Sequence, residues 1–135
     1  MHRRGLAIGA LVLATLFVAT ACSSSSSSTA AGGTTSSGGE PPTNVAGKSS
    51  TAMSAEDFFF TPATLDGTAG QKLTITLSND GSVPHNFSID DQSINVTLQP
   101  GQQKDIQVAF PESGSVQFFC SFHQSSGMVG LLEVA

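Results

Sequence analysis

The sequence predicts an all-β fold, a small sandwich or barrel, in a single modest domain. Apolar residues recur at every second position in three separate segments, for example Ile94-x-Val96-x-Leu98, and this period is typical of strands that bury one face. Turn-forming stretches such as Asn79-Asp80-Gly81 and Pro100-Gly101 separate the segments at intervals of about ten residues. We therefore expect antiparallel strands packed around one core.

The strands are expected in the C-terminal part of the chain. They fall near residues 52–60, 72–78, 84–90, 94–98, 103–110, 115–120 and 129–134. Eight of the nine Phe lie between Phe58 and Phe122, so the apolar core belongs to the same region, and the three consecutive Phe at 58–60 are interpreted as core and edge cover. The predicted folded domain is residues 52–135.

Residues 1–21 have the layout of an export signal. Arg3 and Arg4 precede an apolar stretch, residues 6–21, that ends in small residues directly before Cys22. This stretch of about 16 residues is short for a membrane span, which needs roughly 20, so a cleaved signal peptide is the favoured interpretation. A secreted protein cleaved elsewhere and an uncleaved anchor are the alternatives.

Cys22 and the stretch behind it predict a lipid-anchored tether. The run Ala19-Thr20-Ala21-Cys22 resembles the bacterial lipobox, whose Cys is lipidated as the first mature residue, with Ala19 in place of the usual Leu. Residues 22–51 are rich in Ser, Thr, Gly and Ala, a composition that builds no core. As a flexible coil they would span roughly 30 Å. The expected location is outside the cytoplasm, with the acyl chains of Cys22 in the cell membrane.

The charge of the mature chain excludes one class of partner. From Cys22 onward, three Lys stand against ten acidic residues, a formal charge of −7. Nucleic-acid binding is excluded because phosphates require clustered Lys and Arg. An acidic monomer that docks on redox proteins with a basic patch is expected instead.

Cys120 carries the strongest indication of chemistry. Exported proteins normally pair their thiols, yet lipidation would consume Cys22 and leave Cys120 without a partner. Such a thiol is buried and inert, prone to oxidation, or held as a thiolate by a metal. His123 follows three residues later and Met128 five further, while His85 stands upstream at the start of another predicted strand.

These four side chains together form the donor set of a blue-copper site, two His and a Cys with a weak axial Met. Thiolate stabilises Cu(I), whereas imidazole still binds Cu(II) well. The axial sulfur tunes the relative stability of the two oxidation states. Singly, each has a plainer explanation as a core His, a buried thiol or a core Met, and only their joint occurrence favours a metal site. An enzyme is not expected, because no hydroxyl nucleophile with His and carboxylate partners is identifiable and copper oxidases need more His.

Further stretches carry a family resemblance. They are Cys-Ser-Phe-His-Gln-Ser-Ser-Gly-Met-Val-Gly at 120–130, Pro-His-Asn-Phe at 84–87, Phe-x-Pro at 60–62 and Leu-x-Pro-Gly at 98–101. With them, the region from about Met53 to Ala135 resembles the cupredoxin (blue copper protein) family, and plastocyanin-like members in particular. The resemblance implies a Greek-key sandwich and one copper ion cycling between Cu(II) and Cu(I). It also implies the ligands His85, Cys120, His123 and Met128, with Asn86 tying the two ligand loops together.

Two positions depart from the plastocyanin pattern. Phe122 replaces the usual Pro between Cys and His, and Phe119 replaces a Tyr that serves many members as an electron route. Electron transfer is therefore expected through the edge of His123, inside an apolar collar of Phe122, Val83 and Pro84. The expected function is a membrane-tethered carrier of single electrons between redox partners. The alternative is a copper-binding module for extracytoplasmic copper delivery, sequestration or sensing.

Overall fold

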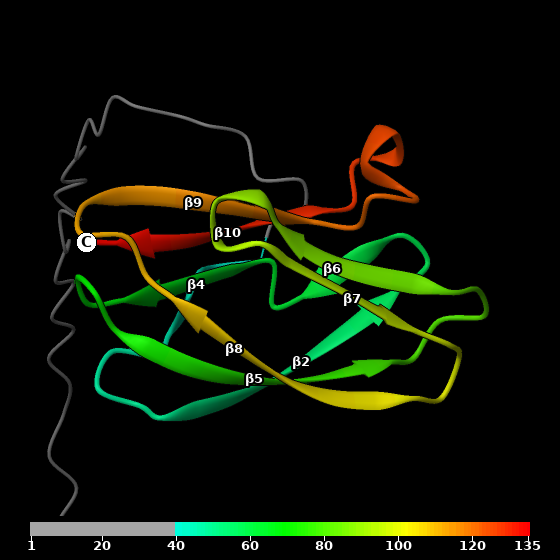
Figure 1. The fold of residues 1–135 in the computed structure, drawn as a ribbon, viewed down its shortest axis with the longest axis horizontal. Coiled ribbons are helices and arrows are strands. Elements are labelled where there is room, and N and C mark those ends of the chain that lie inside the picture. Colours follow the sequence, from blue (N-terminus) through cyan, green and yellow to red (C-terminus); the bar gives the residue numbers. More distant parts are fainter. Residues whose placement is uncertain (1–39) are drawn as a thin grey trace, which may run out of the picture. The chain divides into compact units, whose positions relative to one another are not determined.

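The computed structural model describes residues 40–135, which form two packed β-sheets (Figure 1). The all-β prediction is confirmed, with ten strands and two short 3-10 helices in this part of the chain. The predicted signal peptide (1–21), Cys22 and most of the predicted tether lie outside the described residues. Within residues 40–135, no helix has the length and apolarity that crossing a bilayer requires.

The two sheets differ in size. The larger has the order β1-β4-β10-β9-β6-β7 and the smaller the order β3-β2-β5-β8. The larger contains β1 (Thr43–Asn44), β4 (Thr64–Gly67), β6 (His85–Ile89), β7 (Ile94–Leu98), β9 (Gly114–Phe119) and β10 (Val129–Val134). The smaller contains β2 (Ser50–Glu56), β3 (Phe59–Thr61), β5 (Lys72–Asn79) and β8 (Gln103–Ala109). The helices are η1 (Asp90–Gln92) and η2 (Gln124–Ser126).

The core follows from the alternation seen in the sequence. In β5 the side chains of Leu73, Ile75 and Leu77 are buried, and the residues between them are partly exposed. The antiparallel neighbour β8 places Ile106 opposite Ile75, so both strands turn their apolar faces inward. Phe60, Phe87 and Phe118 also belong to the core, with ring centroids 5.0 to 5.9 Å apart.

Strand direction is where the prediction was wrong. β2 runs parallel to β5, and β4 runs parallel to both β1 and β10, whereas antiparallel pairing was expected. The expected strand at 52–60 is a hairpin of β2 and β3, and β4 lies between residues 60 and 72, where no strand was expected. Alternation reports which face is buried and carries no information on the direction of the neighbouring strand.

The folded region begins before residue 52. β1 pairs with β4, and the side chain of Val45 is completely buried in the core. The Val45 amide donates to the Asp66 carbonyl at 2.8 Å, and the Gln71 side chain donates to the carbonyls of Val45 and Lys48. Part of the stretch expected as tether therefore packs on the domain. One Val among polar residues produces no periodic signal, which is why the sequence placed the boundary later.

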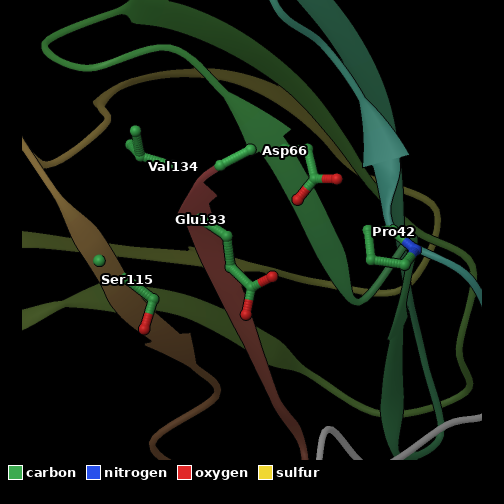
Figure 2. Close-up of a pocket in the computed structure, with 7 residues that line it drawn as sticks. Pro42, Asp66, Ser115, Glu133 and Val134 are labelled. Carbon is green, nitrogen blue, oxygen red and sulfur yellow. The ribbon is translucent and has the colours of Figure 1, made fainter. Parts of the chain in front are cut away.

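A shallow pocket lies at the end of the larger sheet where β9 begins and β10 ends (Figure 2). Its walls include Asp66 and Glu133, which are paired positions of the parallel strands β4 and β10. The opposite ends of β9 and β10 lead into the connection that contains Cys120 and Met128. The pocket is thus one strand length, about 20 Å, from the predicted ligands, and none of them lines it.

Candidate metal centre

Three predicted ligands converge at one end of the sandwich. His85 is the first residue of β6, Cys120 follows β9, and His123 lies in the connection from β9 to β10, drawn orange in Figure 1. Their donor atoms all lie within 4.8 Å of one another. The Sγ of Cys120 is 4.0 Å from Nδ1 of His85 and 3.5 Å from Nδ1 of His123. The fold thereby brings His85 next to Cys120, which lies 35 positions later in the sequence.

These distances fit a metal ion between the donors. A thiolate at about 2.3 Å and an imidazole nitrogen at about 2.0 Å from a metal, at trigonal angles, are about 3.7 Å apart. The two observed separations, 3.5 and 4.0 Å, fall on either side of that value. Both imidazoles present Nδ1 to the thiol, which leaves each Nε2 free for other contacts. The side chains of His85 and Cys120 are completely buried, so this donor set lies largely out of water.

The connection that holds Met128 is fixed by its own backbone. The amide of Cys120 donates to the Met128 carbonyl at 3.0 Å, and the Met128 amide donates to the His123 carbonyl at 3.2 Å. Gly127 adopts a positive φ of 88°, a conformation that glycine reaches without steric cost. Met128 is completely buried. The loop therefore holds Met128 in register with the Cys and His that precede it.

Asn86 joins the two segments that carry the predicted ligands. Its backbone amide donates to Sγ of Cys120 at 3.3 Å, and its Oδ1 accepts a hydrogen bond from the Ser121 amide at 2.6 Å. Its Nδ2 donates to Ser88 and Asn95, each at 3.0 Å. A donor to the sulfur withdraws charge from it, and bonds of this kind orient metal ligands and tune the metal.

Asp57 is a neighbour of the site that the sequence did not reveal. It lies in the turn between β2 and β3, with Oδ1 2.8 Å from Nε2 of His85. Oδ2 accepts hydrogen bonds from the Ser82 hydroxyl and from the Ser82 amide, the latter at 2.9 Å. The pKa of Asp57 is lowered to about 2, mainly by the two hydrogen bonds from Ser82 and to a smaller extent by the contact with His85. A single Asp in a turn carries no periodic or motif signal that would have identified it.

Phe58 also lies beside the site, whereas the sequence assigned it to the core and edge cover of the sandwich. Its ring centroid is 4.4 Å from that of His123, at an interplanar angle of 45°, and 6.1 Å from that of His85. Phe122 meets His123 edge-on at 6.4 Å. Phe58 and Phe122 are 42% and 54% exposed, whereas Phe60 is in the core as predicted. The apolar surround of His123 therefore includes Phe58 as well as Phe122 from the predicted collar.

Two imidazoles and a thiol converge at one end of this β-sandwich. This combination is typical of a small metalloprotein whose metal is held by nitrogen and sulfur donors. A family model described as a cupredoxin-like domain matches residues 11–132. The chain belongs to this cupredoxin-like family. The expected cofactor, one copper ion, is confirmed by this membership together with the donor set.

Known relatives agree with this assignment. The chain is 31% identical over 87 residues to plastocyanin of Cucumis sativus, which covers 56% of this chain and 86% of the relative. It is 32% identical over 87 residues, with the same coverage, to plastocyanin of Cucurbita pepo. Among solved structures, reduced auracyanin from Roseiflexus castenholzii shares the fold with a TM-score of 0.55 at 19% identity, covering 65% of this chain and 98% of that one.

Proposed function

We propose that the protein is a type 1 (blue) copper protein that carries single electrons and is not an enzyme. His85, Cys120, His123 and Met128 are the proposed ligands. The observation that carries the proposal is the convergence of two Nδ1 atoms and one Sγ at separations of 3.5 and 4.0 Å. When bound, copper supplies a one-electron Cu(II)/Cu(I) couple.

The side chains around the site favour rapid electron exchange. Backbone hydrogen bonds inside the Cys120 to Met128 loop, and the Asn86 bonds across to it, hold the donors in one arrangement. A fixed arrangement means that little movement accompanies a change of oxidation state. His123 is the partly exposed member of the group, and Phe58 and Phe122 surround it with apolar surface. The edge of His123 is the proposed point at which electrons enter and leave.

Copper delivery, the alternative function, uses the same ligands with copper as cargo. Burial supports the electron carrier, because His85, Cys120 and Met128 are all completely buried and a buried donor set retains its ion.

Titration with Cu(II) tests the site, with one equivalent bound and an intense visible band expected. Reversible oxidation with copper retained, and impaired respiratory electron flow on deletion, support the carrier. A deletion that alters only copper tolerance contradicts it.

The proposed location is outside the cytoplasm, with the lipidated Cys22 in the cell membrane. Membership of the cupredoxin-like family supports an extracytoplasmic site, and the sequence of residues 1–51 supports the anchor. In this arrangement the tether holds the copper domain within reach of membrane-bound redox partners while letting it reorient.

Replacing Met128 with Leu tests its proposed role as a copper ligand. The variant is expected to keep copper and its visible band, because the His and Cys donors remain. Its reduction potential should rise, since loss of the thioether removes a donor that stabilises Cu(II). A tenfold change in the relative affinity for the two oxidation states corresponds to about 59 mV, and a shift of that order is expected in voltammetry.

The control is Met53→Leu, the same substitution in the core strand β2, which should leave the reduction potential unaltered. Equal potentials in the two variants would remove Met128 from the ligand set.

Salt dependence tests the proposed basic partner. The formal charge of −7 from Cys22 onward should attract such a protein, and charge attraction raises association rates by about ten- to a thousandfold. The screening length falls from about 30 Å at 0.01 M salt to about 8 Å at 0.15 M. Electron exchange with a small basic cytochrome, followed by stopped flow, should therefore slow at least about tenfold over that range. A rate that is independent of salt argues for apolar docking alone.

A further inference from the structure

We infer that Asp57 is a positioning residue of the copper centre, which acts through His85 to orient its imidazole and to favour Cu(II) over Cu(I). The inference rests on the proposed function and concerns a residue outside the four ligands. Its basis is the hydrogen bond between Asp57, in the exposed turn from β2 to β3, and the buried residue His85.

The contact is built from both sides. His85 is completely buried, and its Nε2 lies 2.8 Å from Oδ1 of Asp57. The other carboxylate oxygen accepts two hydrogen bonds from Ser82, one from the hydroxyl and one from the amide. Ser82 thus fixes the carboxylate so that Oδ1 faces His85.

This contact determines which nitrogen of His85 carries the proton. A carboxylate only accepts hydrogen bonds, so Nε2 must donate, and in neutral imidazole the proton then resides on Nε2. The lone pair is left on Nδ1, which is the atom that faces Cys120. Carboxylate partners of this kind fix the tautomer and raise the basicity of a ligand His. A more basic ligand and a nearby negative charge both stabilise the more positive ion, which lowers the reduction potential.

Gly81 provides an independent indication that this contact is a specific arrangement. A Cβ at position 81 would lie 2.3 Å from Oδ1 of Asp57 and 2.8 Å from Nε2 of His85. Any larger residue would therefore enter the space where the two groups meet. The turn is held in place by the buried Asn79, which accepts from the Gly81 amide at 3.0 Å and donates to the Val83 carbonyl at 2.9 Å.

Asp57→Asn in the full chain is the principal test, and the readout is the reduction potential. Asn keeps the size and an acceptor oxygen but removes the charge, so the potential should rise. Loss of such a partner weakens metal affinity by about 10- to 100-fold. If the loss falls on Cu(II) alone, a tenfold decrease is a rise of about 59 mV for one electron. Asp57→Glu restores a carboxylate and should recover most of the shift.

The matched control is Asp66→Asn. It removes the same charge from the pocket at the opposite end of the larger sheet (Figure 2), and its potential should equal that of the wild type. Gly81→Ala keeps every carboxylate but separates Asp57 from His85, so its potential should rise as well. Equal potentials in Asp57→Asn and Asp66→Asn overturn the inference. So does a wild-type potential in Gly81→Ala, since charge at a distance would then account for the whole effect.

A second readout does not depend on copper. In the copper-free protein, nitrogen NMR should show an exchange-protected proton on Nε2 of His85, and Asp57→Ala should abolish the protection. A proton found on Nδ1 instead overturns the inference. Failure of the proposed function has a different signature, because a wild-type chain that binds no copper can still show this protected proton.

Discussion

Replacing Cys120 with Ser is expected to abolish the intense visible band of the copper-loaded protein. The band of a blue-copper site comes from charge transfer between the thiolate and copper, and Cys120 contributes the Sγ that lies 3.5 Å and 4.0 Å from the two imidazole nitrogens. A hydroxyl in that place is a poor ligand for Cu(I), so copper affinity should fall as well. Absorption spectroscopy during Cu(II) titration measures both effects.

The control for this variant is the other cysteine of the chain. Cys22→Ser should keep the visible band at full intensity, because Cys22 is the predicted lipidation site and not a predicted ligand. Copper should also stabilise the wild type, by about 2.7 kcal/mol at a free concentration 100 times the dissociation constant, and this gain should be lost in Cys120→Ser. A Cys120→Ser protein that is still blue would refute the ligand assignment.

Truncating Phe118 to Ala is expected to cause the largest loss of stability among these variants. Phe118 is completely buried, and its ring centroid lies 5.0 Å from that of Phe87 and 5.3 Å from that of Phe60. The ring also fills the space above Gly130, where a Cβ would come within 2.2 Å of it. Removing a buried Phe side chain costs about 3 to 5 kcal/mol, a large part of the roughly 5 to 15 kcal/mol that holds a domain folded.

Denaturant unfolding of the copper-free protein measures this loss without the contribution of metal binding. Phe122→Ala is the matched control, because Phe122 is 54% exposed and exposed substitutions usually change stability by less than about 0.5 kcal/mol. Similar unfolding midpoints for the two variants would show that the aromatic cluster does not stabilise the fold.

The amino-acid sequence by itself determined the β-strand content of this protein and indicated its proposed donor set. Alternating apolar residues predicted most strands to within a few residues, because burial of one face leaves a period of two along the chain. The two His, the Cys and the Met were proposed as ligands from their chemistry and from the spacing between Cys120 and Met128. Local signals of this kind can be read from the sequence without any knowledge of the tertiary structure.

Only the tertiary structure determined which distant groups meet. The parallel pairing of β4 with β10, the burial of Val45, and the contact of Asp57 with His85 all join segments that are far apart in sequence. Asp57 and Phe58 belong to a turn with no motif, yet that turn lies against both imidazoles. Periodicity and spacing describe neighbours along the chain, whereas the surroundings of a metal ligand depend on how strands from two sheets end at the same place.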